Sequence, residues 1–238
     1  MISIDKIPKE ELENLVKDLA SKVEEVSELK CNLEEGIVQS VNGIVKNTGV
    51  VGQYDPLENK IFISEKMECN EKWELEKIII HELAHNAQFS NYKNLFPRFK
   101  KEIIELYLSR KGLKYLLFKS PGDRINYIQE RSLISNLIEG DATLINLKIL
   151  KKDYKIVSVA NFSDRYLKMA NILEKKFGDN RKEINQLYLA PIKELYKIFR
   201  EGVDSYESPR METLEWMFKG IEEIKKRNEN GPIELEVI

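Results

Sequence analysis

The chain has two histidines, and both belong to the pentapeptide His81-Glu82-Leu83-Ala84-His85. Side chains four residues apart on an α-helix lie on the same face, so both imidazoles can reach one metal ion about 2 Å away. Glu82 follows the first histidine and can lean toward a water bound to that ion. The spacing therefore predicts a catalytic zinc site with His81 and His85 as ligands and Glu82 as general base.

The residues around this motif favour a helix. Residues 71–91 follow Asn70, a good N-cap, and carry apolar side chains at helical spacing without a proline or glycine. An alternative interpretation makes the two histidines ordinary members of an amphipathic helix, paired with the backbone or exposed to solvent.

An open catalytic zinc site has three protein ligands, and the chain has no third histidine to complete the set. We expect a carboxylate instead. Glu139 is the glutamate within the otherwise apolar stretch of residues 133–147, where a charged group is costly unless it is paired. Coordination of a cation would provide that pairing. The alternative places Glu139 on the polar edge of its helix.

The neighbours of Glu139 carry further expectations. Gly140 and Ala142 are small, which predicts a close crossing between this helix and the helix of the histidines. Asp141 has two interpretations that the sequence leaves equal: it accepts a hydrogen bond from a ligating histidine, or it faces solvent on the opposite side of its helix.

Composition excludes several classes of function. Among 238 residues, 42% are hydrophobic and 33% are charged, with a formal net charge of -2, so no strong field would attract nucleic acid or an acidic membrane. The apolar runs are too short to span a bilayer. Cys31 and Cys69 form no CxxC pair, and the first thirty residues do not have the pattern of a signal peptide. These features predict a cytoplasmic protein with no membrane or nucleic-acid partner, and they leave the oligomeric state open.

The order of patterns predicts an α+β fold that is predominantly α. Residues 8–30 have helical periodicity behind Pro8. Residues 36–64 are rich in valine, isoleucine and glycine, which predicts a small sheet with a turn at Asp55-Pro56. Later helices are expected at residues 97–118, 123–152, 161–177, 181–201 and 209–228. We expect two subdomains: residues 1–95 with the sheet and the HExxH helix, and residues 96–238 with the third ligand.

Several segments resemble one family of metallopeptidases. They are HELAHNAQF, Asn94-Leu95-Phe96, SLISNLIEGDA and SYESPRMETLEW. The chain resembles the gluzincin branch of the zincin-like metallopeptidases, and more narrowly the type 2 zincin-like family associated with deazaflavin-coenzyme biosynthesis, over roughly residues 50–220. The resemblance implies a zincin-like fold, with His81, His85 and Glu139 as zinc ligands and Glu82 as base. Asp141 departs from the EGHA-like motif of that family.

The predicted activity is zinc-dependent hydrolysis of peptide bonds. The oxyanion needs a second electrophile, and with both histidines used as ligands the candidates are Tyr206 and Arg210. Both could equally be ordinary loop residues. A peptide or protein substrate would lie extended along the edge strand formed by residues 61–63 or along its neighbour.

Two alternatives remain. The chain could be a catalytically silent zinc-binding protein with a regulatory or interaction role, although retention of Glu82 argues for chemistry. The helix at residues 8–30 could bind a partner or inhibit the site, but an ordinary amphipathic helix with a solvated charged face explains its pattern more simply.

Overall fold

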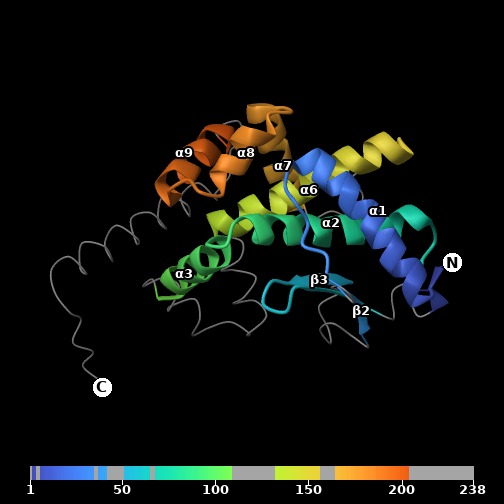
Figure 1. Ribbon diagram of the computed structural model, residues 1–238. Helices are drawn as coiled ribbons and strands as arrows, with labels where there is room; N and C mark the ends of the chain where they lie inside the picture. Colours follow the sequence, from blue (N-terminus) through green and yellow to red (C-terminus); the bar gives the residue numbers. More distant parts are fainter. Residues whose placement is uncertain are drawn as a thin grey trace, which may run out of the picture. The chain divides into compact units, whose positions relative to one another are not determined.

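The computed structural model describes residues 2–3, 6–34, 37–41, 51–64, 68–108, 132–155 and 164–203 (Figure 1). The helices are α1 (Lys9–Ser27), α2 (Lys72–Asn91), α3 (Leu95–Leu108), α6 (Leu133–Tyr154), α7 (Asp164–Phe177), α8 (Arg181–Leu187) and α9 (Ile192–Val203). The strands are β1 (Ile2–Ser3), β2 (Val38–Val41), β3 (Gly52–Asp55), β4 (Lys60–Ser64) and β5 (Glu68–Cys69). This part of the chain is mainly helical with little sheet, which confirms the expected α+β class.

The chain divides into two compact units. The first comprises Met1–Phe96 and Leu137–Leu189, and the second comprises Pro97–Asn136 and Ala190–Ile238. The first break lies close to the expected boundary between residues 95 and 96. The difference is that residues 137–189 belong with the N-terminal segment. Within this unit Gln88 of α2 donates to the backbone of α6, and Arg181 of α8 pairs with Asp141 of α6. All the candidate metal ligands therefore lie in one unit.

The larger sheet has the strand order β2-β4-β3, with β2 parallel and β3 antiparallel to the central strand β4. The predicted turn between β3 and β4 is present: Asp55 Oδ1 accepts from the amide of Leu57 at 2.8 Å, and Asn59 adopts a positive φ of 52°. Residues 61–63 therefore lie in the central strand and not at an edge as expected, and their neighbour β3 is at the edge of the sheet that the described residues form. The sequence did not predict the short pair β1-β5.

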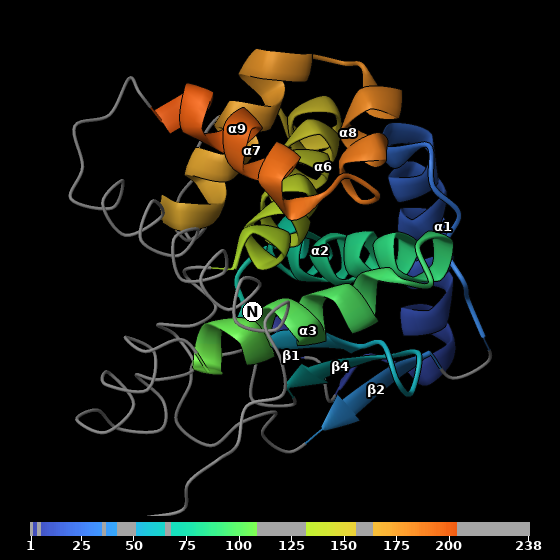
Figure 2. The ribbon, with the colours of Figure 1, turned by 90° about the vertical axis from the view of Figure 1, so that its left-hand side faces the viewer.

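α2 occupies the centre of the first unit, with the three-stranded sheet on one side and α6 on the other (Figures 1 and 2). Its apolar side chains at Leu75, Ile79, Ile80 and Leu83 are 0–1% exposed, so almost all of the helix is covered. The N-cap of the helix is Glu71, one residue after the expected Asn70. Glu74 completes this end because its carboxylate accepts from the amides of Asn70 and Glu71.

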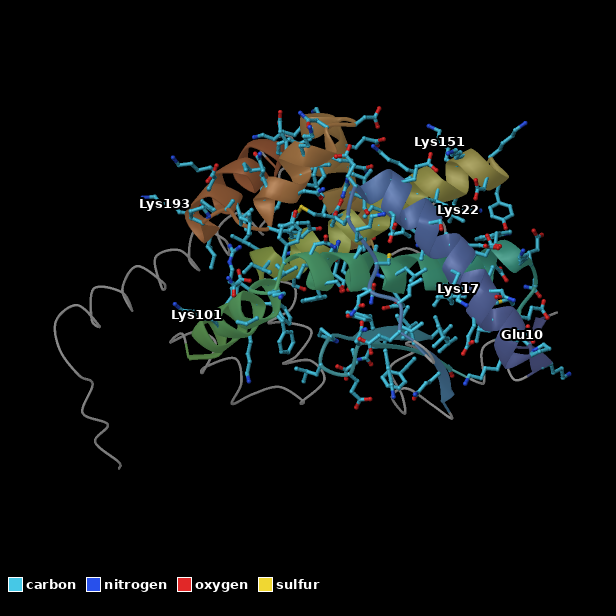
Figure 3. The ribbon with its side chains drawn as sticks, in the orientation of Figure 1. Glu10, Lys17, Lys22, Lys101, Lys151 and Lys193 are labelled. Atoms are coloured by element: carbon cyan, nitrogen blue, oxygen red, sulfur yellow. The ribbon has the colours of Figure 1, made fainter. Side chains whose placement is uncertain are left out.

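α1 packs against α2 and contributes directly to the core. The side chains of Leu12, Val16 and Leu19 are at most 7% exposed. Glu10 and Lys17 lie on the exposed face of the same helix (Figure 3). This arrangement confirms the amphipathic helix and gives its apolar face a structural role within the fold.

Gly140 of α6 faces a different helix from the one expected. A Cβ atom added to Gly140 would lie 2.2 Å from Met169 Cγ and 2.5 Å from Met169 Cβ, so this glycine allows α7 to pack against α6. The expectation that Gly140 faces the histidine helix was wrong. Ala142, fully buried, does lie in the core cluster that contains the apolar side of α2.

The second unit holds the start of α6 by a buried carboxylate. Glu102 on α3 accepts from the amides of Leu133 at 2.8 Å and Ile134 at 3.1 Å, and also from the hydroxyl of Ser132. These contacts satisfy amides that have no partner within a helix. The glutamate is fully buried, so this cap is part of the interior of that unit.

Other expected helices are confirmed in part. α7 matches the segment predicted at residues 161–177, whereas the predicted helix at residues 181–201 is two helices, α8 and α9. The chain turns before Pro191, whose ring cannot continue a helix. The helix expected at residues 209–228 lies outside the described residues. None of the described helices has the length and apolar character needed to cross a membrane.

Candidate metal centre

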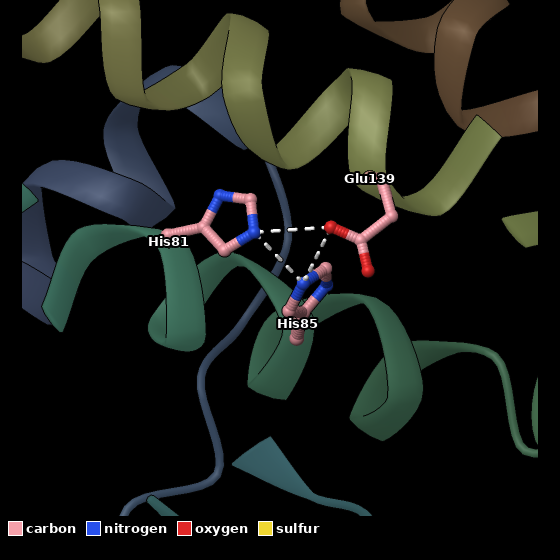
Figure 4. A group of neighbouring side chains, drawn as sticks. All are labelled: His81, His85 and Glu139. Atoms are coloured by element: carbon pink, nitrogen blue, oxygen red, sulfur yellow. Dashed lines mark hydrogen bonds and ion pairs between the residues drawn. The ribbon is translucent and has the colours of Figure 1, made fainter. Parts of the chain in front are cut away.

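Three polar side chains converge between α2 and α6 (Figure 4). His81 Nε2 lies 3.1 Å from Glu139 Oε2, His85 Nε2 lies 3.6 Å from the same oxygen, and the two Nε2 atoms are 3.2 Å apart. The histidines are one helical turn apart on α2, as the spacing predicted. Glu139 projects from α6 onto the same point, although 58 residues separate it from His81.

The donor atoms fit a tetrahedral metal ion. Donors about 2.1 Å from a tetrahedral zinc ion are about 3.4 Å from one another, and the observed separations of 3.1, 3.2 and 3.6 Å bracket that value. His81, His85 and Glu139 could therefore hold one metal ion. Two imidazole nitrogens and one carboxylate oxygen form a donor set that suits zinc.

His81, His85 and Glu139, called the metal group below, are accessible to solvent on part of their surface. The side chains of His81, His85 and Glu139 are 18%, 10% and 24% exposed. A structural zinc site is closed by four protein ligands, whereas a catalytic one keeps a position for water. Within the described residues only three candidate ligands gather here, which matches the open type.

The local charges favour a cation at this point. Burial lowers the pKa of His85, but the carboxylates of Glu139 and Glu82 outweigh it and raise that pKa to about 9. Burial raises the pKa of Glu139, but the positive charge on His85 and hydrogen bonds from both histidines hold it well below its usual range. Glu139 is thus ionised. Its negative charge favours a proton on His85, and a bound metal ion would take the place of that proton.

Glu82 lies on the side of α2 that faces the sheet. Its side chain is buried, and its Oε2 accepts from the backbone amide of Tyr54 in β3 at 2.7 Å. Gly52 permits this approach, since a Cβ atom there would lie 2.4 Å from Ile78 Cγ2 and 3.4 Å from Glu82 Oε1. The edge strand therefore holds the predicted base, whose catalytic role stays a prediction.

Asp141 follows neither of its two expected interpretations. It is fully buried, and its carboxylate accepts from Arg181 at 2.6 and 3.0 Å and from the hydroxyl of Tyr188 at 2.5 Å. Gln88 lies between this ion pair and the metal group, with Oε1 3.0 Å from His85 Nδ1 and Nε2 3.4 Å from Asp141 Oδ2. Asp141 thus reaches the ligand through one intermediate side chain.

No protein-family model, curated protein or solved structure matches this chain.

The sequence missed three residues that surround the ligands. Gln88 lies three positions after His85, on the same side of the helix, and this spacing could have indicated it. Arg181 and Tyr166 gave no such signal, because they are brought to the site only by the packing of α8 and α7. The ring of Tyr166 stacks on that of His81 with centroids 6.4 Å apart.

Tyr206 and Arg210, the two electrophiles expected from the sequence, lie outside the described residues.

Proposed function

We propose that the chain is a zinc-dependent metallopeptidase of the gluzincin type. The observation that carries this proposal is the convergence of two imidazole nitrogens and one carboxylate oxygen, 3.1–3.6 Å apart, beside a buried glutamate at the next position. In this proposal His81, His85 and Glu139 hold the ion. The order of sheet, HExxH helix and distant glutamate is what a zincin-like fold requires, so that fold is part of the proposal.

Bound zinc supplies a Lewis acid that lowers the pKa of water toward 7 and polarises a carbonyl oxygen. Glu82 removes the proton from the attacking water and transfers it to the amine nitrogen as the peptide C–N bond breaks. One carboxylate oxygen of Glu82 is held by the Tyr54 amide at 2.7 Å, which leaves Oε1 for the proton. Tyr206 and Arg210 stay candidates for the group that stabilises the oxyanion.

The proposed substrate is a peptide or protein segment in an extended conformation. β4 is bonded on both sides, by β2 and β3, so it has no free edge. β3 is an edge strand of the described sheet, and its residue Tyr54 touches the proposed base. A peptide paired with β3 would run past Glu82, and backbone hydrogen bonds would hold it whatever its side chains are.

The test combines metal content with cleavage of a diverse peptide pool. We expect Glu82→Gln to keep zinc and lose activity by about 100-fold or more, since general-base catalysis contributes about that much. Glu139→Ala should lose most of its zinc as well as its activity. Glu58→Gln, which removes the same charge from the exposed turn of the hairpin, is the matched control and should retain both.

Three outcomes would each contradict a different part of the proposal. A wild-type protein that holds zinc and cleaves nothing in the pool would favour the silent zinc-binding protein. Unchanged zinc affinity in Glu139→Ala would remove the third ligand. A Glu82→Gln variant with full activity would remove the proposed base while leaving the metal centre intact.

A further inference from the structure

A buried chain of polar groups leads away from His85. Its members are His85, Gln88, Asp141, Arg181 and Tyr188, of which none is more than 8% exposed. They come from α2, α6 and α8 and from the residue after α8. A buried polar group is costly unless it is hydrogen-bonded, so each contact in this chain restricts which atom donates and which accepts.

The donor and acceptor roles are clearest in the Asp141–Arg181 ion pair, the part of this network farthest from His85. Asp141 accepts two hydrogen bonds from Arg181 and one from Tyr188, at distances of 2.5–3.0 Å. Burial and the charge of Asp141 both raise the pKa of Tyr188, so its phenol keeps its proton and donates. With these donors around it, the carboxylate of Asp141 can only accept.

The amide of Gln88 is oriented as a consequence. Its Nε2 lies 3.1 Å from the backbone oxygen of Ile138 and 3.4 Å from Asp141 Oδ2. Both of these atoms are acceptors, so the NH₂ end of the amide must face them. The amide oxygen is left facing His85.

The nitrogen that carries the proton on His85 follows in turn. Gln88 Oε1 lies 3.0 Å from His85 Nδ1 and can only accept, so the hydrogen of a neutral imidazole is on Nδ1. The lone pair is then on Nε2, the atom that lies 3.2 Å from His81 Nε2 and faces the metal group. The donor-to-acceptor direction of these hydrogen bonds thus leaves His85 Nε2 free to bind a metal ion.

We infer that Asp141, held by Arg181, is a positioning residue that sets the tautomer and ring orientation of His85 through Gln88. The inference rests on the proposed metal centre only in treating His85 as a ligand. A ligating histidine usually donates its other ring N–H directly to a carboxylate, a backbone carbonyl or a water molecule. Here an amide transmits the direction of hydrogen bonding over one more side chain.

The first test removes the acceptor without adding charge. Gln88→Met keeps a side chain of similar length, and its Zn²⁺ dissociation constant should rise about 10- to 100-fold, the usual cost of losing such a partner. Nitrogen-15 NMR of the metal-free protein with His85 neutral should show that His85 Nδ1 no longer carries the proton preferentially. Gln186→Met, the same change on the exposed side of α8, is the control and should alter neither quantity.

The second test reverses the direction of the hydrogen bond between residues 88 and 141. Gln88→Glu places a carboxylate against Ile138 and Asp141, which offer no donor, so zinc binding should be weaker than in the wild type. Adding Asp141→Asn supplies an NH₂ group to that carboxylate. The double variant should therefore bind zinc about tenfold more tightly than Gln88→Glu alone, whereas two independent structural losses would add.

The zinc affinities of these variants separate the positioning role of Asp141 from the proposed metal centre itself. Zinc affinity within twofold of the wild type in Gln88→Met, or additive losses in the double variant, would overturn the inference. If the wild type binds no zinc, the proposed function fails. The NMR of metal-free protein, recorded at a pH at which the chemical shifts show a neutral His85, then still tests whether Gln88 selects Nδ1.

Discussion

The two histidines of the candidate metal centre are neighbours on one helix, but they are held in different ways. His85 is tied to Asp141 and Arg181 through Gln88, and its side chain is 10% exposed. His81 has a side chain that is 18% exposed, and it stacks on Tyr166 with an interplanar angle of 21°. One ligand is oriented by hydrogen-bond direction and the other partly by ring packing. The first should therefore respond to changes of charge, and the second to changes of shape.

The largest effect is expected where the polar chain of His85 is broken at the ion pair. Asp141→Ala leaves the guanidinium of Arg181 buried without its carboxylate. Removing one partner of a buried pair costs about 3–5 kcal/mol, so we expect the free energy of unfolding to fall by about that amount. Urea denaturation of the metal-free protein measures the loss without interference from bound zinc.

Asp179→Ala is the matched comparison for that variant. Asp179 pairs with Lys148 at 2.6 Å, but its side chain is 99% exposed, so its removal should cause no measurable change in stability. Equal losses in the two variants would contradict the view that burial makes the Asp141–Arg181 pair important.

A smaller effect is expected where α6 meets α7. Gly140→Ala would bring a Cβ atom to 2.2 Å from Met169 Cγ, so α6 and α7 must separate. We expect a net loss of about 1–2 kcal/mol in the free energy of unfolding, because overpacking costs about 1–3 kcal/mol and alanine returns up to about 1 kcal/mol of helix propensity. Zinc affinity should fall too, since Glu139 and Tyr166 lie on these two helices.

Met169→Gly supplies the control for this contact, because it removes both the Cβ and the Cγ atom of Met169. In the double variant Gly140→Ala/Met169→Gly the remaining contact is with the backbone carbon of residue 169 at 3.3 Å, so both stability and zinc affinity should recover relative to the sum of the single effects. Strict additivity would show that the α6–α7 contact at Gly140 is not what separates the helices.

The sequence predicted those parts of the centre that depend on local periodicity. The four-residue spacing of His81 and His85 fixes their common face once the segment is helical, and Glu139 was identifiable because a charge in an apolar stretch needs a partner. Gly140 shows the limit of this reasoning. A small residue predicts a close contact but does not identify the helix that makes it, and here the partner was α7.

The polar chain behind His85 was beyond prediction for a related reason. Asp141 is two residues from Glu139, yet its partner Arg181 lies 40 residues away at the start of a short helix. Nothing in the spacing of α8 distinguishes this buried arginine from the many exposed lysines and arginines of the chain. Such pairs are set by tertiary packing, which a single sequence does not specify.

The smallest effect concerns the ring that packs on His81. Tyr166→Ala removes the stacked ring, and since aromatic pairs contribute about 0.5–1.5 kcal/mol, zinc should bind only about two- to tenfold more weakly. Tyr166→Phe keeps the ring and should bind zinc like the wild type. An equal loss in both variants would assign the effect to the hydroxyl group. A loss larger than that of Gln88→Met would reverse the comparison and make ring packing the stronger constraint on the metal ligands.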